Sequence, residues 1–251
     1  MCRLLGIFSE NQFELRESRV ILDEFIEIAK KDKTLGHTHG DGWGLAWIKD
    51  NQYRLHKEVK PIWESKIPDS ISSFSYILHA RKASMGGIFI ENTHPFQMED
   101  ILLAHNGHIN QRLAAVRHKP TGTTDSENFL AMLMDLRDRY HDTEEALFEA
   151  IKKIGYNFYA LNLIVGSLKE KMFWILNYYN NTDLQHSIHY SIRYRVEDDK
   201  LIIASEPLGK NNWNVLSNKP LYPILMRIPF EDPLEYDVMP LKVPMAMIKS
   251  G

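Results

Sequence analysis

The segment NFYALNLIVGSLKEKMFWILNYY, residues 157–179, decides the fold class. It contains two runs rich in β-branched and aromatic residues, 157–166 and 171–179, on either side of a short polar turn. This pattern predicts two antiparallel strands joined as a hairpin. Two further runs of the same kind follow at residues 187–196 and 200–205. The second half of the chain is therefore predicted to be an antiparallel meander.

Helices and further strands are predicted upstream of this meander. Apolar residues at helical spacing predict helices over residues 18–33, 126–140 and 143–154, and short apolar runs predict buried strands over residues 2–8, 74–80 and 101–105. The order is strands, a helix pair and more strands, without strand–helix alternation. This order predicts an α+β fold in which antiparallel sheets pack against helices.

Composition narrows the classes of protein to consider. The 251 residues include 30 Lys plus Arg and 33 Asp plus Glu, and 44% of them are hydrophobic. A globular chain without a Lys/Arg-rich block favours neither nucleic acid nor a membrane surface as partner. No apolar leader or run of roughly 18 apolar residues occurs, so we expect a cytoplasmic protein. No repeat or linker divides the chain, and a single domain over residues 1–251 is predicted.

Cys2 is the one cysteine in the sequence, which excludes an intramolecular disulfide and a zinc site built from cysteines. Removal of Met1 would leave Cys2 with a free α-amine. Because that amine has a reference pKa of about 7.7–8 and the thiol one of about 8.5, the amine can serve as base for its own sulfur. The alternative is that Cys2 is a small buried hydrophobic residue on a strand.

Asn106 and Gly107 follow the apolar run of residues 101–104. An Asn-Gly pair at the end of a strand is typical of a tight turn. The same pair can also form an oxyanion hole, in which the Asn106 side-chain amide and the Gly107 N–H stabilise a developing negative charge. The sequence leaves both interpretations open.

Arg81 and Asp125 are candidates for binding a charged substrate. Arg81 follows an apolar strand and stands at the start of a loop, where a guanidinium can hold a carboxylate through two hydrogen bonds. Asp125 lies at the start of a predicted helix, where it can either cap the helix or bind a substrate ammonium.

These residues belong to a set of motifs that resembles one family. The motifs occur in the following order: Cys2 after Met1, Gly42-Trp43-Gly44-Leu45-Ala46, Ala80-Arg81-x-Ala83-Ser84, Asn92-Thr93-His94-Pro95, His105-Asn106-Gly107 and Thr124-Asp125-Ser126-Glu127. Their order and spacing resemble those of the class II glutamine amidotransferases, which are N-terminal nucleophile (Ntn) hydrolases. The resemblance covers residues 2–130, and the later meander looks like the standalone, single-domain branch.

The resemblance implies a four-layer αββα sandwich with two antiparallel sheets. It also implies that Cys2 is the nucleophile, that its α-amine is the general base, and that Asn106 and Gly107 form the oxyanion hole. No metal or organic cofactor is implied.

For the substrate, the resemblance implies that Arg81 binds the α-carboxylate and Asp125 the α-ammonium. Ser84 stands where many relatives have threonine and is expected to support the carboxylate. Two positions depart from the multidomain members of the family. Lys82 and Met85 stand where those enzymes commonly have tryptophan and histidine.

The implied activity is hydrolysis of the γ-amide of glutamine through a thioester on Cys2, with delivery of ammonia to an unknown acceptor or a synthase partner. The first alternative is a γ-glutamyl hydrolase that acts on a γ-glutamyl peptide or a thiol-related γ-glutamyl compound. A second, from another class, is a non-catalytic module that binds glutamine or γ-glutamyl groups.

Histidines suggest a different possibility, because eight of the eleven lie between His37 and His118. The His37-x-His39 pair near Asp41 is a candidate for a divalent metal site. The competing interpretation makes His37 and His39 solvated loop residues and gives a structural role to the histidines around the site, which are His79, His94 and His105.

Overall fold

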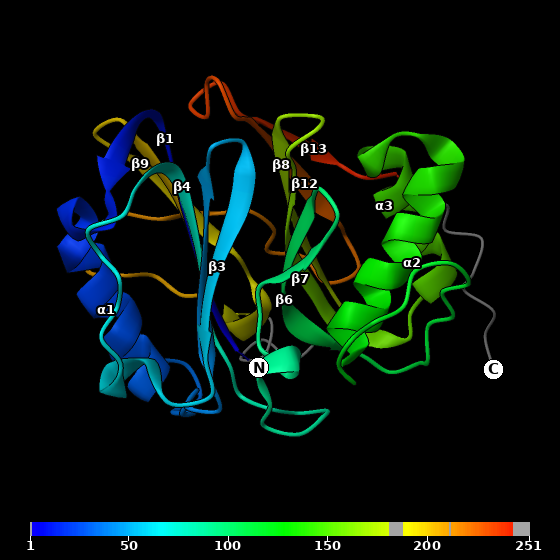
Figure 1. The fold of residues 1–251 in the computed structure, drawn as a ribbon, viewed down its shortest axis with the longest axis horizontal. Helices are drawn as coiled ribbons and strands as arrows, with labels where there is room; N and C mark the ends of the chain where they lie inside the picture. Colours follow the sequence, from blue (N-terminus) through cyan, green and yellow to red (C-terminus); the bar gives the residue numbers. More distant parts are fainter. Residues whose placement is uncertain (1, 181–187, 211, 243–251) are drawn as a thin grey trace.

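The computed structural model describes residues 2–180, 188–210 and 212–242. Two antiparallel sheets lie face to face with helices on their outer sides (Figure 1). Helix α1 (Arg19–Lys30) covers one sheet, and α2 (Asp125–Tyr140) and α3 (Thr143–Ile154) cover the other. The layers are therefore those of an αββα sandwich, and the predicted α+β fold is confirmed.

The first sheet contains the N-terminal strand in a central position. Its order is β11 (Asn214–Val215), β9 (Arg193–Glu197), β10 (Lys200–Ala204), β1 (Arg3–Glu14), β4 (Ser72–Ala80), β2 (Trp43–Lys49) and β3 (Gln52–Glu58). Strand β1 thus pairs with β4 on one side and β10 on the other.

The second sheet carries the hairpin predicted from residues 157–179. Its order is β13 (Asp237–Pro240), β12 (Ile224–Pro229), β8 (Met172–Tyr179), β7 (Phe158–Ser167), β6 (Ile101–Ile109) and β5 (Phe96–Met98). Short 3-10 helices lie at Leu15–Ser18, Ile62–Glu64 and Ile90–Asn92.

Alternation along the strands separates three apolar layers. On β1, Leu4 faces the second sheet, whereas Leu5 faces α1 and packs with Phe25. On β6, Ala104 joins Leu4 between the sheets. Because successive side chains of a strand point to opposite faces, this assignment also fixes the directions of the neighbouring polar residues.

Two expectations for the C-terminal half differ from the structure. The run 187–196 becomes a strand only from Arg193, since residues 188–190 are helical; residues 181–187 lie outside the described part of the chain. The prolines from Pro220 onward predict edge strands and extended chain, but β12 lies inside its sheet. Prolines are tolerated there because Pro223 precedes β12 and Pro229 ends it.

None of the helices within the described residues combines the length and the hydrophobicity that crossing a bilayer requires.

Candidate active site

Cys2 lies immediately before β1, beside the loop that follows β4. Arg3 is opposite Ala80 in the β1–β4 ladder, which brings Cys2 to the start of this loop. The Lys82 N–H donates to the Cys2 Sγ over 3.4 Å, and the thiol lies 3.5 Å from the Lys82 carbonyl oxygen. The thiol is buried at 9% exposure. Met1, whose removal would free the Cys2 amine, lies outside the described residues.

The surroundings of the thiol favour its protonated form. Burial raises the pKa of Cys2 above its ordinary value, although the Lys82 N–H and the guanidinium groups of Arg81 and Arg3 act in the opposite direction. Loss of water disfavours the thiolate more strongly than these groups stabilise it. Nucleophilic chemistry at Cys2 therefore needs a base that removes the proton.

Asn106 lies on β6, in the sheet opposite the one whose strand β1 begins after Cys2. Like Ala104 two residues earlier, it points between the sheets, as Cys2 does two residues before Leu4. Asn106 is fully buried, and neither its Nδ2 nor its Oδ1 has a hydrogen-bond partner among the described residues. Buried amides without hydrogen-bond partners are rare, because nothing then compensates the free energy lost when the amide leaves water. This amide group is consequently a strong candidate for contact with a ligand.

The backbone that carries Asn106 is held by two histidines. The His105 ring lies 2.8 Å from the Ser126 Oγ and donates from Nε2 to the Ala160 carbonyl over 3.0 Å. The His79 Nε2 donates to the His105 carbonyl over 3.1 Å, across the two sheets. Burial brings the pKa of His79 down to about 3, so its ring is neutral at physiological pH. His79 and His105 thus support the strand that carries Asn106.

Gly107 occupies a position that no larger residue fits. A Cβ there would lie 1.8 Å from the Ala160 carbonyl oxygen and 2.4 Å from the His105 Nε2. Glycine is required because the β6 backbone approaches β7 so closely at this point.

The Arg81 guanidinium is buried and holds the loop that follows it. Its two terminal nitrogens donate to the carbonyl oxygens of Gly87 and Met85, each over 3.0 Å. A guanidinium has five N–H donors, so three remain for another ligand. Ser84 lies exposed in the same loop and is not gathered into the site in this arrangement.

Asp125 begins α2 but does not cap it. Thr124 is the N-cap, and its side chain accepts the hydrogen bond from the Glu127 N–H. The Asp125 Oδ2 instead accepts a hydrogen bond from the Ile109 N–H over 2.7 Å and lies 3.4 Å from the His108 Nδ1. The capping alternative for Asp125 is therefore wrong, and its carboxylate is available for another role.

A cavity of about 430 Å³ lies beside Asp125, with Met85 and His108 in its lining. Met85 also supplies a carbonyl oxygen to Arg81. The loop that Arg81 holds therefore reaches the cavity that Asp125 lines.

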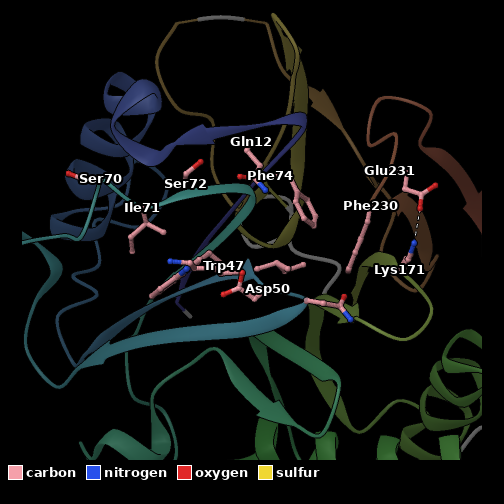
Figure 2. Close-up of a pocket in the computed structure, with 13 residues that line it drawn as sticks. Gln12, Trp47, Asp50, Ser70, Ile71, Ser72, Phe74, Lys171, Phe230 and Glu231 are labelled. Carbon is pink, nitrogen blue, oxygen red and sulfur yellow. Dashed lines mark hydrogen bonds and ion pairs between the residues drawn. The ribbon is translucent and has the colours of Figure 1, made fainter.

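A larger cavity, of about 880 Å³, lies elsewhere (Figure 2). Its lining includes Gln12 on β1 and the aromatic rings of Trp47, Phe74 and Phe230. Ser72, which also lines it, lies eight residues along β4 from Ala80, the partner of Arg3, and this corresponds to roughly 26 Å at the usual rise of a strand. The size of this cavity does not make it the reaction site, because it lies at the end of the sandwich remote from Cys2.

Arg3, the residue after Cys2, is the centre of a buried ionic network. Its guanidinium donates to the Cys2 carbonyl over 2.9 Å and lies 2.8 Å from the Asp32 Oδ2 and 3.6 Å from the Glu206 Oε2. Burial by itself raises the pKa of Asp32, but Arg3 and the loop N–H donors outweigh it and bring this pKa to about 2. The motif comparison did not identify this network.

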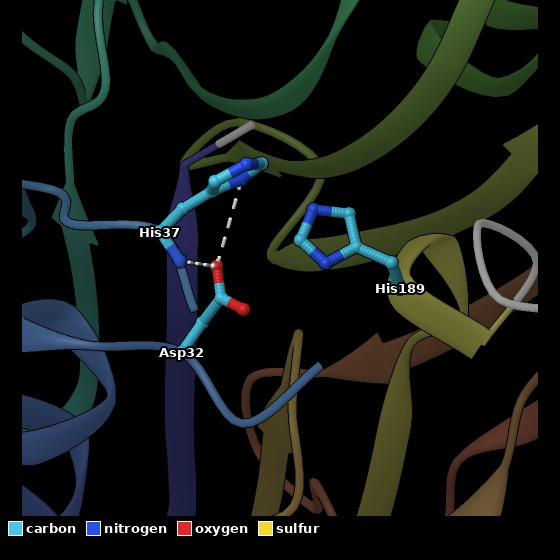
Figure 3. A group of neighbouring side chains, drawn as sticks. All are labelled: Asp32, His37 and His189. Carbon is cyan, nitrogen blue, oxygen red and sulfur yellow. Dashed lines mark hydrogen bonds and ion pairs between the residues drawn. The ribbon is translucent and has the colours of Figure 1, made fainter. Parts of the chain in front are cut away.

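Asp32, His37 and His189 meet near Arg3 and have the composition of a metal site (Figure 3). Their potential ligand atoms lie within 4.8 Å of one another. However, the Arg3 guanidinium lies 2.8 Å from Asp32 and donates to the His189 Nδ1 over 3.3 Å. A metal ion would have to displace this permanent cation. The group is better described as the shell around Arg3.

The metal site suggested from the sequence, His37 and His39 near Asp41, is not assembled as predicted. His39 is fully buried and donates to the Asp32 Oδ2 over 3.1 Å, so its description as a solvated loop residue is wrong. Asp41 accepts a hydrogen bond from the Ala83 N–H over 2.8 Å, in the loop that follows Arg81. His39 therefore hydrogen-bonds to the partner of Arg3, whereas Asp41 hydrogen-bonds to the loop after Arg81.

Comparison with protein families gives a match over the N-terminal two thirds of the chain. A family model described as class II glutamine amidotransferases matches residues 1–166. This range contains all the candidate site residues named above except the partners of Arg3 in the later meander.

Individual relatives agree with this match. A Haemophilus influenzae protein named "Putative glutamine amidotransferase" is 27% identical over 87% of this chain and 82% of its own length. The glutamine–fructose-6-phosphate aminotransferase of Oceanobacillus iheyensis is 27% identical over 69% of this chain, but this match covers only 28% of the relative.

Solved structures share the fold. A glutamine aminotransferase class-II domain protein from Silicibacter pomeroyi superposes with a TM-score of 0.63 at 17% identity, covering 96% of this chain and 99% of the other. The glutamine phosphoribosylpyrophosphate amidotransferase of B. subtilis gives a TM-score of 0.62 at 13% identity, covering 95% of this chain and 49% of the other.

Proposed function

This chain belongs to the class II glutamine amidotransferases, and from that premise we propose that it hydrolyses the γ-amide of glutamine through a glutamyl thioester on Cys2. One observation carries the proposal. By the alternation of side chains along β1 and β6, Cys2 and Asn106 point between the two sheets, where Leu4 and Ala104 pack, and the Asn106 amide has no hydrogen-bond partner among the described residues. This arrangement supports a nucleophile that faces a preorganised site for negative charge.

Arg81 and Asp125 are proposed to bind the amino-acid head of the substrate. A zwitterionic head needs one fixed cation and one fixed anion, and the guanidinium retains three donors after holding its loop. Asp125 lines a cavity and is held by the Ile109 N–H, so its carboxylate is fixed in direction. Ser84 would have to turn inward from its exposed position to assist with the carboxylate.

The reaction needs a base because burial favours the protonated thiol. After removal of Met1, the α-amine of Cys2 would take the thiol proton as the sulfur attacks the γ-carbonyl carbon. The Asn106 Nδ2 and the Gly107 N–H would donate to the oxyanion of the tetrahedral intermediate. The C–N bond then breaks, the amine proton goes to the leaving ammonia, and water hydrolyses the thioester to release glutamate and the thiol.

The ammonia would be delivered to an unknown acceptor or to a synthase partner. The leaving group can be tested directly by comparing glutamine with γ-glutamyl peptides and γ-glutamyl thiol-related compounds. A preference for the latter would establish the γ-glutamyl hydrolase alternative, and binding without turnover would establish the non-catalytic module. The single domain over residues 1–251 and the cytoplasmic location stay predictions.

The experiment that tests the proposal compares two preparations of the protein, one with Met1 removed and one in which Met1 is retained. Intact mass identifies each form, and ammonia release from glutamine measures turnover. We expect turnover only from the form with a free Cys2 amine. Equal turnover by the two forms would contradict the proposed base.

A further inference from the structure

Asn92 joins two segments that lie far apart in the sequence. Its Nδ2 donates to the Gly87 carbonyl over 3.0 Å, in the loop that Arg81 holds. Its Oδ1 accepts a hydrogen bond from the Thr123 N–H over 2.8 Å, two residues before Asp125. The side chain is 1% exposed, so water does not compete for these bonds.

The Gly87 carbonyl is shared between Asn92 and Arg81, because both donate to it over 3.0 Å. Arg81 and Asp125 are therefore connected through the Gly87 carbonyl oxygen, the Asn92 amide and the short segment from Thr123 to Asp125. Asn92 links the loop to this segment through hydrogen bonds at both ends of its side-chain amide.

The packing around Asn92 leaves little freedom. A Cβ on Gly86 would lie 2.8 Å from the Asn92 Nδ2, and a Cβ on Gly122 would lie 2.4 Å from the Asn92 Oδ1. The Glu127 carboxylate also holds the second segment by accepting hydrogen bonds from the N–H groups of Thr121 and Gly122. Both segments thus pack against the amide: Arg81 holds the first, Glu127 holds the second, and Asn92 forms hydrogen bonds to both.

We propose that Asn92 is a positioning residue that sets the separation of Arg81 and Asp125, so that both charges of one amino-acid head are met at once. The inference rests on the proposed roles of these two residues. A zwitterion has a fixed distance between its charges, and an error of about 1 Å in its placement lowers the rate steeply. The Asn92 side chain forms its hydrogen bonds with Gly87 and Thr123 and not with Cys2, so its proposed role is to position other residues.

The test compares two electrophiles that alkylate the same sulfur. The compound 6-diazo-5-oxo-L-norleucine carries the amino-acid head of glutamine, whereas iodoacetamide carries none. In Asn92→Asp the carboxylate still accepts from the Thr123 N–H but can no longer donate to the Gly87 carbonyl. We expect its labelling by the diazo compound at residue 2 to slow about tenfold or more, and its labelling by iodoacetamide to stay within about twofold of wild type.

A matched control and a second variant complete the design. Glu91→Gln changes the neighbouring exposed side chain, leaves the amide in place and should react with both reagents as wild type does. Gly122→Ala places a methyl group 2.4 Å from the Asn92 Oδ1, 2.8 Å from the Glu91 carbonyl oxygen and 2.9 Å from the Glu127 Oε2. It should therefore displace the segment before Asp125 and show the same selective loss as Asn92→Asp.

Two outcomes would overturn the inference. One is an Asn92→Asp or Gly122→Ala protein that reacts with the diazo compound at the wild-type rate. The other is an equal slowing with both reagents, which would indicate general damage around Cys2. A wild-type protein that the diazo compound fails to label would instead contradict the proposed function itself, so the two failures are distinguishable.

Discussion

The Arg3 guanidinium lies 2.8 Å from the Asp32 carboxylate, in an interior where the two side chains are only 1% and 0% exposed. The same guanidinium donates to the carbonyl of Cys2. The backbone of the proposed nucleophile is therefore anchored by a cation that has its own buried counter-ions. Such pairs are costly to break because the remaining charge stays buried without compensation.

Asp32→Asn should be strongly destabilising for this reason. We expect the free energy of unfolding to fall by about 3–5 kcal/mol, as measured by chemical denaturation. The matched control is Asp23→Asn, which removes an exposed partner of Arg19 and should cost less than about 1 kcal/mol. Similar losses in the two variants would show that burial of the Arg3–Asp32 pair has no energetic consequence.

Asn106→Ala should separate catalysis from stability. Because the Asn106 amide has no hydrogen-bond partner within residues 2–180, 188–210 and 212–242, its removal breaks no hydrogen bond with these residues. We expect kcat to fall by about 10²–10³, as for loss of one oxyanion-hole donor, while the unfolding midpoint changes little.

The control for that variant is Asn162→Ala, since Asn162 lies opposite Asn106 in the ladder and is equally buried. Its amide donates to the Tyr190 carbonyl over 2.6 Å and accepts from Asn177. Asn162→Ala should lower stability by about 1–3 kcal/mol. An Asn106→Ala protein with unchanged kcat would remove the proposed oxyanion donor.

Asp125→Asn tests recognition of the substrate ammonium. Removal of one member of a buried charge pair costs about 2–5 kcal/mol, so kcat/KM for glutamine should fall at least about 30-fold. A glutamine analogue without the α-amine should be turned over equally slowly by wild type and variant. If instead the variant discriminates against this analogue as strongly as wild type does, Asp125 does not bind the ammonium.

Acid should destabilise the fold before any carboxylate is protonated. Burial lowers the pKa of His39 to about 2 and those of His79 and His189 to about 3. Below a pH of about 6.5 these histidines bind protons in the unfolded chain but stay neutral in the folded protein. The free energy of unfolding therefore decreases as the pH is lowered, by up to about 1.4 kcal/mol per pH unit for each histidine. Denaturation curves at pH 7, 6 and 5 measure this slope. A stability that stays constant over this range would contradict the neutral buried state of these rings.

The fold class could be predicted from sequence because its signals are local. The two β-branched and aromatic runs within residues 157–179 and the helix periodicities each specify their own element. The order of strands in the sheets could not be predicted in the same way. Leu5 pairs with Ala204, almost two hundred residues away, and no local periodicity encodes that partner.

The motif residues were identified from sequence, but their local contacts were not. Nothing in the sequence indicated that Arg81 donates to two carbonyls of its own loop, or that Ser84 lies exposed beside it. A signal for the Arg3 network was present, because a charged residue within the apolar run of residues 2–8 requires a buried partner. The identity of that partner, Asp32, depends on tertiary packing that the run does not specify.

The formation of a thioester on Cys2 is tested most directly by acid-quenching the Met1-free protein during turnover of glutamine and measuring the mass of its N-terminal peptide. We predict one glutamyl group on the sulfur of residue 2, removable by hydroxylamine and absent from Cys2→Ala, which should have no turnover. A Cys2→Ala protein that releases ammonia from glutamine at the wild-type rate would contradict the account.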